Sequence, residues 1–209
     1  EFGYDKIKQK ITAFNNNINC QMNSLNWDES FAGYEEKIKY LDDALLKHKF
    51  DKETEIEIYK QLIDSLTSVS AGYNITGFSQ KEFEKKVAYL ERARKLNEDY
   101  MKSESLYNYL YSNKTIIDQD IYNLEINKAE KNLNESLLLV ENFSLEDYPY
   151  KNYKDTFDDQ KRDLEVSYLE SLAAIFVQTK RYSEAITLYE NIIKSSEKIL
   201  STSFQQNLK

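Results

Sequence analysis

The sequence predicts an all-α protein built from antiparallel helix pairs. Three observations support this prediction. Apolar residues recur every three or four positions along most of the chain, as they do on one face of an amphipathic helix. Four glycines and a single proline interrupt 209 residues, so sharp turns are few. Alternating apolar and polar runs, which would indicate strands, are scarce. We therefore expect helices joined by short turns.

The first 50 residues are predicted to form two helices. An apolar stripe predicts the first helix over about residues 4–25, and the polar run 15–17 predicts a frayed or kinked second half. The stripe consists of Ile7, Ile11, Phe14 and Ile18. Asn26 and Asp28 are suitable N-caps for a second helix. Its Gly33 costs about 1 kcal/mol relative to Ala and is predicted to permit a close helix crossing.

A third helix is predicted to begin after Asp51 and to end near residues 70–72. Glutamates occupy its first turn, where they favour the helix dipole. The stretch 73–78 contains two residue types typical of turns, Gly and Asn. Ser79 is followed three residues later by Glu82, which matches a capping box and predicts the start of a fourth helix.

The middle of the chain is rich in tyrosine. The segment 98–111 is predicted to be helical and to present aromatic rings on two faces. A turn is predicted at Ser112 and Asn113. A long helix over about 116–140 is then expected, and its end is apolar all round, which indicates burial on several sides.

The single proline, Pro149, marks the best candidate boundary. It disfavours helical geometry in the preceding residue, so a break is predicted near 146–152. Apart from this break, residues 1–200 are predicted to form a single helical domain. The polar segment 201–209 is predicted to be a flexible tail, because it has little apolar surface to bury.

The stretch from Tyr168 to Leu200 has the pattern of a helix pair joined by the polar turn 179–182. Its first helix carries an apolar face of Leu169, Leu172, Ala173 and Phe176, and its second a face of Ala185, Tyr189 and Ile192. Two helices cross closely where a small residue meets a ring or a leucine. Ala173 and Ala185 supply these small residues.

This pattern resembles the tetratricopeptide repeat, a helix pair of about 34 residues with a small residue in each helix. Tyr182 matches the aromatic residue that commonly opens the second helix of this family. Leu169 and Glu197 depart from the family, which often has Trp and Pro at these positions. The resemblance implies a right-handed solenoid of stacked pairs that binds proteins or peptides without catalysis.

The same spacing extends to three earlier quartets, which gives about four helix pairs. The quartets are Tyr34, Lys37, Leu41 and Ala44; Phe83, Lys86, Leu90 and Ala93; and Ile126, Ala129, Leu133 and Ser136. Lys37 and Lys86 stand where a small residue is expected, and their stems are predicted to bend out towards water. An ordinary amphipathic helix reproduces much of this pattern without any repeat.

The charge of the chain bears on its partners. A net charge of -8 and an isoelectric point near 4.9 argue against nucleic acid, which requires clustered Lys and Arg. They favour a protein or peptide with a basic or mixed-charge surface. No apolar run approaches the roughly 18 residues of a membrane helix. We therefore expect a soluble chain with no membrane insertion.

Residues that could carry chemistry are few. Cys20 and His48 are the only residues of their types, so neither a disulfide nor a zinc-binding pattern is possible within the chain. His48 is interpreted as part of a solvated helix end. An acidic stripe of Asp155, Asp159 and Asp163, with Asp158 beside it, is interpreted as a solvated helix face, because calcium loops need a glycine turn. We expect no cofactor, no metal and no catalytic residue.

The lone cysteine also bears on localisation. A chain without disulfides favours a reducing compartment such as the cytoplasm, although an exported protein that has lost its signal peptide is compatible with the same composition. The chain begins at Glu1 without a Met. We therefore expect a processed or trimmed chain.

The resemblance implies that first-helix side chains line a partner-binding groove. Tyr107, Asn108 and Tyr111 are the candidate partner-binding residues of the third pair, because Tyr buries a large ring and keeps a hydroxyl for the partner. The alternative is that these rings belong to the core. Two further functional hypotheses remain, a peptide-sensing regulatory domain of a larger protein and an enzyme with dispersed carboxylates in a helical cavity.

Overall fold

The structure is a computed structural model that describes residues 4–72, 80–148 and 156–206. Within these ranges the chain is all-α, about 90% helical and free of strands, as the sequence predicts. The helices pack in sequence as consecutive antiparallel pairs. The chain divides into two compact units, Glu1–Gln119 and Asp120–Lys209, and each is described separately.

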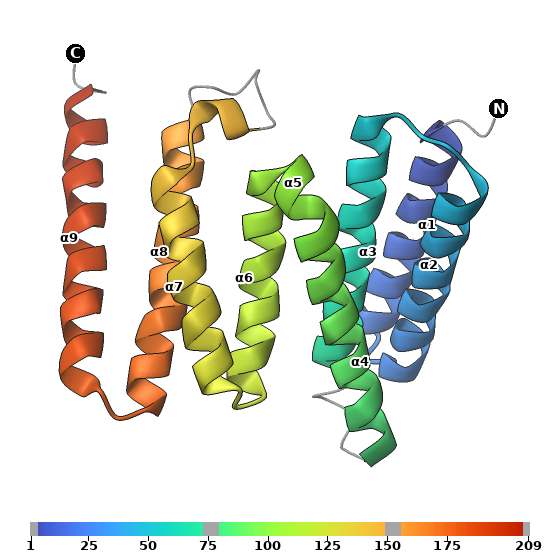
Figure 1. Cartoon of the computed structure of the whole chain (residues 1–209), viewed down its shortest axis with the longest axis horizontal. Helices are drawn as coiled ribbons and strands as arrows, with labels where there is room; N and C mark the ends of the chain where they lie inside the picture. The colour runs from blue at the N-terminus through green and yellow to red at the C-terminus, as the bar shows by residue number, and fades with distance from the viewer. Residues whose placement is uncertain (1–3, 73–79, 149–155, 207–209) are drawn as a thin grey trace. The chain divides into compact units, whose positions relative to one another are not determined.

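The first unit begins with four long helices that pack in chain order. Contacts join α1 to α2, α2 to α3 and α3 to α4, and Figure 1 shows their alternating directions. The elements are α1 (Tyr4–Asn23), α2 (Trp27–Lys47), α3 (Lys52–Gly72), α4 (Gln80–Leu96), the π-helical turn η1 (Asn97–Met101), α5 (Lys102–Glu104) and α6 (Leu106–Tyr122), whose last three residues belong to the second unit.

The contact between α1 and α2 is unusually close at one point. A Cβ added to Gly33 would lie 2.9 Å from Cγ1 of Ile18, a buried residue of the predicted apolar stripe. The predicted close crossing at Gly33 is therefore confirmed. The helix α1 continues without a break through residues 15–17, so the expected fraying in its second half does not occur.

The second unit consists of the end of α6 and three further helices. Among the described residues these helices are α7 (Ile126–Asn142), α8 (Phe157–Gln178) and α9 (Tyr182–Gln206), and the 3-10 turn η2 (Leu145–Asp147) lies between α7 and α8. α8 packs against both α7 and α9, and the three run alternately up and down (Figure 1). α9 includes residues 201–206, which the sequence pattern assigns to a tail. The predicted break at Pro149 lies outside the described residues, as does the capping residue Ser79.

Three helix-to-helix turns of the described chain share one hydrogen-bonding pattern. Each places a residue other than glycine at a left-handed φ of 56° to 63°, namely Leu25, Leu124 or Lys180. The amide of this residue donates to the carbonyl three positions back, and the next amide donates to the carbonyl five positions back. This bonding closes the helix C-terminus as a Schellman motif. The following helix begins two residues after the left-handed residue: α2, α7 or α9.

The matching turns place a small buried residue at the same position in each following helix. Five residues after the left-handed residue stand Ser30, Ala129 and Ala185, all almost fully buried. The amide of each makes the first hydrogen bond of its helix. A small side chain at this point lets the second helix approach the first closely. The predicted small-residue role of Ala185 is thus confirmed.

The turns also correct one alignment made from the sequence. They align Ser30 of α2 with Ala185, whereas the sequence pattern aligns Lys37, seven residues later. Seven residues are nearly two full helical turns, so the same face recurs and apolar periodicity cannot distinguish the two registers. Only the backbone conformation of the turn fixes the register.

The predicted long helix over 116–140 is wrong. The structure has two helices there, α6 and α7, which meet at the turn around Leu124. The predicted turn at Ser112 and Asn113 lies within α6. A left-handed turn normally uses glycine, and leucine at this position gives the sequence no recognisable turn signal.

Candidate functional site

One side of α9 carries exposed apolar side chains. Tyr182, Ile186, Tyr189 and Ile193 follow each other at spacings of four, three and four, and all are exposed. We call these four residues the α9 stripe. The covered face of α9 lies about 100° around the helix from the stripe, which corresponds to a shift of one residue. It includes the buried Ala185 and the half-buried Leu188 and Ile192. The α9 stripe therefore lies beside the face of α9 that is already covered.

The positions of α2 and α7 that align with the α9 stripe are all less exposed: three are buried and the other five are half-buried. The matching turns align Tyr189, which is 42% exposed, with Leu133 of α7, which is fully buried. They align Ile186 and Ile193 with the buried Phe31 and Ile38 of α2. Both α2 and α7 are followed by a helix that packs on them, α3 and α8. Within the described residues, the α9 stripe has the apolar composition of an interface and no such following helix.

A small groove lies between α8 and α9. Its volume is about 330 Å³, and α8 contributes Leu172 and Phe176 to it. The residues that α9 contributes include Ser183, Thr187 and Asn191, which are on the opposite side of the helix from the α9 stripe. The surface of this groove is largely apolar, but it lies within the α8–α9 pair. The α9 stripe runs along about three turns of helix and is exposed over this length, so we take it as the candidate surface for an apolar partner.

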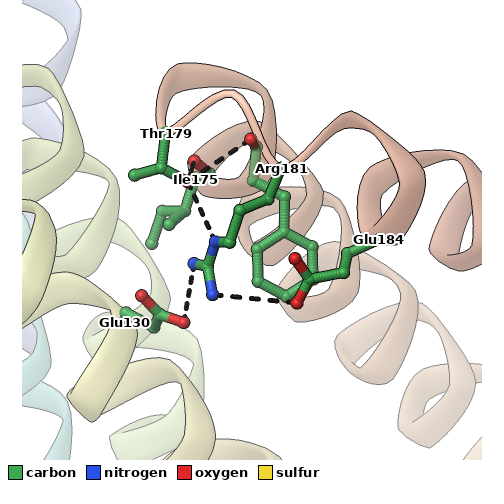
Figure 2. Close-up of polar contacts among 6 residues, drawn as sticks. Glu130, Ile175, Thr179, Arg181 and Glu184 are labelled. Atoms are coloured by element: carbon green, nitrogen blue, oxygen red, sulfur yellow. Dashed lines mark hydrogen bonds and ion pairs between the residues drawn. The ribbon is translucent and has the colours of Figure 1, made fainter.

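Arg181 fixes the start of α9 against both other helices of its unit. Its guanidinium donates from Nη2 to Oε1 of Glu130 on α7 over 2.7 Å, and from Nε to the hydroxyl of Thr179 over 3.0 Å. It also stacks 4.2 Å above the ring of Phe176. Figure 2 shows this cluster, with Glu184 on the far side of the guanidinium. The α9 stripe is therefore presented by a helix with a defined orientation.

The turn itself is closed by further hydrogen bonds. The hydroxyl of Thr179 donates to the carbonyl of Ile175 over 2.8 Å, and the amide of Arg181 donates to the carbonyl of Phe176 over 2.7 Å. Ser24, in the turn before α2, makes the same side-chain bond to Cys20 over 2.9 Å. These bonds satisfy carbonyls that a helix end otherwise leaves unpaired.

The three partner-binding residues expected from the sequence differ in exposure. Tyr111 is 54% exposed and Tyr107 is half-buried, so both could contact a partner from α6. Asn108 is only 6% exposed, and its amide donates to the hydroxyl of Ser105 over 3.1 Å. The expectation that Asn108 is exposed is therefore wrong, because helical spacing turns it towards the core. A partner-binding role of these residues stays a prediction.

The two lysines expected to extend into water are buried instead. Lys37 and Lys86 are 3% and 1% exposed. Burial lowers the pKa of both ammonium groups. Lys37 finds its hydrogen-bond partners inside the first unit, on Asn15 and Gln61. Polar side chains spaced along α1 and α3 could have indicated this, but each also fits a solvated helix face.

The described residues that were weighed for chemistry lie at a helix end and on an exposed helix face. His48 caps the end of α2 with its ring 6.0 Å from that of Phe50. Asp159 and Asp163 have largely exposed side chains beside Arg162, and Asp155 lies outside the described residues. In the part of the chain that the structure describes, no group of His, Cys, Asp and Glu side chains could hold a metal ion. Nor does any helix there have the length and apolarity needed to cross a membrane.

Comparisons with known proteins identify no family for this chain. No family model, no curated protein and no solved structure matches it. The helix pairs and their matching turns therefore carry the functional interpretation on their own.

Proposed function

We propose that this protein is a non-enzymatic protein-binding scaffold, and that the α9 stripe receives an amphipathic helix of a partner protein. The observation that carries the proposal is the contrast between Tyr189 and its aligned counterpart Leu133: Tyr189 is exposed, whereas Leu133 is fully buried in a helix on which the next helix packs. A helix docked on the α9 stripe would repeat the contact that α8 makes with α7. This is the helix-in-groove mode of recognition, with anchors at helical spacing.

The residue types of the α9 stripe indicate which residues the partner helix should carry. Two tyrosines and two isoleucines offer large apolar surfaces, and tyrosine rings are frequent anchors at protein interfaces. Glu184 and Glu190 are exposed on the same helix. We therefore expect the partner helix to place apolar residues against the stripe and Lys or Arg at its margins.

The proposal includes a relationship to tetratricopeptide-type solenoids. It is supported by the consecutive antiparallel pairs and by the three matching turns with a small residue in a constant position. A right-handed stacking of the pairs is part of this proposal. In such arrays each pair contacts only its neighbours, so a helix face on which no described helix packs is a natural place for a further helix.

Site-specific photocrosslinking tests the proposal. Tyr189 and Tyr111 are each replaced by a photoreactive phenylalanine derivative in otherwise identical chains, and the products formed in the native host are identified by mass spectrometry. We expect Tyr189 to yield a discrete partner, crosslinked through a helical segment. Tyr111 is an exposed tyrosine of α6 outside the α9 stripe, and it serves as the control position for Tyr189.

A pair of charge substitutions provides the control. Ile186→Glu places a charge in the α9 stripe, whereas Lys194→Glu changes the charge of an exposed residue outside it. The crosslink at Tyr189 should disappear with Ile186→Glu and persist with Lys194→Glu. A partner that attaches only at Tyr111, or one that ignores Ile186→Glu, would refute the proposed docking surface.

A further inference from the structure

The first unit contains a polar pocket that the scaffold function does not use. It lies among α1, α2 and α3 and has a volume of about 320 Å³. This is roughly ten times the volume that a water molecule occupies in the liquid. Polar side chains of all three helices line it, among them Asn19, Tyr34, Lys37, Asp64 and Ser68. The pocket is open to solvent, since Asn19 is exposed, yet its Lys37 is almost fully buried. Ligand pockets are mostly apolar, so this composition requires a reason.

Lys37 is the buried cation of this pocket. Its ammonium donates to Oδ1 of Asn15 on α1 and to Oε1 of Gln61 on α3, both over 2.9 Å. The amide nitrogen of Gln61 in turn donates to Glu57 over 3.0 Å, which keeps the amide oxygen directed at Lys37. Two of the three N–H groups of the ammonium thus donate to protein oxygens. The third is available to an acceptor in the pocket.

Asp64 supplies the opposite charge. It lies one helical turn beyond Gln61 on α3, and its carboxylate accepts no hydrogen bond from the residues that the structure describes. Burial raises the pKa of this carboxyl, while Lys60 and Lys37 partly oppose the shift. The charges of Lys37 and Asp64 therefore act on each other, and each lacks a full set of partners. Lys37 is buried and Asp64 is half-buried. A charge that loses water without gaining a full set of partners is costly, so a ligand that satisfies both would stabilise the fold.

Three further groups could bind a ligand. Asn19, Tyr34 and Ser68 line the same pocket, and their side chains make no hydrogen bond within the described chain. They offer an amide and two hydroxyl groups, which donate as well as accept. The pocket thus combines one cation, one anion and neutral hydrogen-bonding groups in a volume suited to a small molecule.

We propose that this pocket binds a small zwitterion of the α-amino acid class, with the ligand carboxylate on the ammonium of Lys37 and the ligand ammonium on the carboxylate of Asp64. A simple anion would leave Asp64 unpaired and would be repelled by it. A simple cation would leave the third N–H group of Lys37 without an acceptor and would be repelled by its ammonium. A zwitterion pairs both charges and leaves the net charge of the pocket unchanged.

Thermal denaturation with defined probes tests this inference. The melting temperature of the full chain is measured with glycine, L-alanine or L-serine, and with acetate or methylammonium at equal concentration and ionic strength. At ten times the Kd, one of the amino acids should raise the melting temperature by about 3 °C. Acetate and methylammonium should each leave it unchanged. Isothermal titration calorimetry then gives the Kd.

Three variants locate the binding. Asp64→Asn removes one charge with little change of shape and should weaken binding at least tenfold. Ser68→Leu fills the pocket and should abolish the shift while the circular dichroism spectrum stays helical. Glu53→Gln removes an exposed carboxylate from the same helix and should bind like the parent. The inference is overturned if none of the three amino acids binds, if acetate gives the same shift as they do, or if Ser68→Leu keeps the response.

Discussion

The guanidinium of Arg181 lies 2.7 Å from the carboxylate of Glu130, and this contact ties the turn before α9 to α7. Both side chains are about one-third exposed, so water screens the pair and limits its contribution. The bond nevertheless has two supports that a surface ion pair lacks, the hydroxyl of Thr179 and the ring of Phe176.

Arg181→Met should therefore lower the free energy of unfolding by about 1 kcal/mol. The methionine keeps an apolar stem near the Phe176 ring but removes the bonds to Glu130 and Thr179. Urea denaturation followed by circular dichroism measures the loss. Arg162→Met is the matched control, because the aspartates that Arg162 contacts are largely exposed. It should change stability by less than about 0.5 kcal/mol. Equal losses in the two variants would show that Arg181 has no special structural role.

The close contact between Gly33 and Ile18 yields a second prediction. Gly33→Ala should destabilise the protein by about 1 kcal/mol, although alanine is the better helix former, because the new methyl group would lie within 2.9 Å of Ile18 Cγ1. In an Ile18→Ala background the clash is removed, so the same substitution should become neutral or stabilising. A double-mutant cycle measured by chemical denaturation tests this coupling. Additive losses would contradict it.

A charge should lower stability strongly at one residue of α9 and hardly at all at its neighbour. Ala185 is 3% exposed at the crossing with α8, so Ala185→Glu should cost more than about 2 kcal/mol and unfold the final helix pair. Ile186 is 59% exposed, and Ile186→Glu should change stability by less than about 0.5 kcal/mol. Thermal melts of the two variants make the comparison. Normal stability of Ala185→Glu would rule out the tight crossing.

Two carboxylates should give stability profiles of opposite slope with pH. Burial raises the pKa of Asp64 above its ordinary value of 3.8, so its ionised form opposes folding. This penalty is absent below pH 3.8 and complete above the folded-state pKa. Asp64→Asn should therefore gain stability relative to the parent as the pH rises from 3 to 7. Denaturation midpoints across this range measure the gain.

Asp51 provides the comparison. Its carboxylate accepts bonds from the amide and the hydroxyl of Thr54 over 2.8 and 3.0 Å, and these bonds lower its pKa below 3.8. It therefore stabilises the fold above pH 3.8, and this contribution is lost as the pH falls through the folded-state pKa. Asp51→Asn should lose stability relative to the parent as the pH rises. If both variants show the same slope, the assignment of these two environments is wrong.

Much of the fold follows from local patterns. The spacing of Ile7, Ile11 and Ile18 predicts α1 because apolar burial on one face is a property of a single helix. Asp51 predicts the start of α3 because its cap bonds involve residues within the same turn. The pairing of α8 with α9 can be predicted in the same way, because Ala185 and the polar turn before it lie close together in the sequence.

The candidate surfaces were harder to predict. The α9 stripe is visible in the sequence as apolar residues, yet Leu133, the α7 residue that aligns with Tyr189, is fully buried. Exposure depends on whether another helix packs there, and periodicity carries no information on that point. Tyr107 and Tyr111 are candidates because of the resemblance and the chemistry of tyrosine, and no neighbouring pattern distinguishes them from core tyrosines.

The sequence by itself determined the helical class, the antiparallel pairing and most helix bounds, because these depend on interactions within about one or two turns of chain. The tertiary structure alone decided the turn at Leu124, the register of α2 and the burial of Lys37. Each of these depends on partners distant in sequence or on a backbone conformation that the residue type does not reveal. A leucine at positive φ is stable only where surrounding contacts compensate for its strain, and a buried ammonium only where amides from two other helices converge on it.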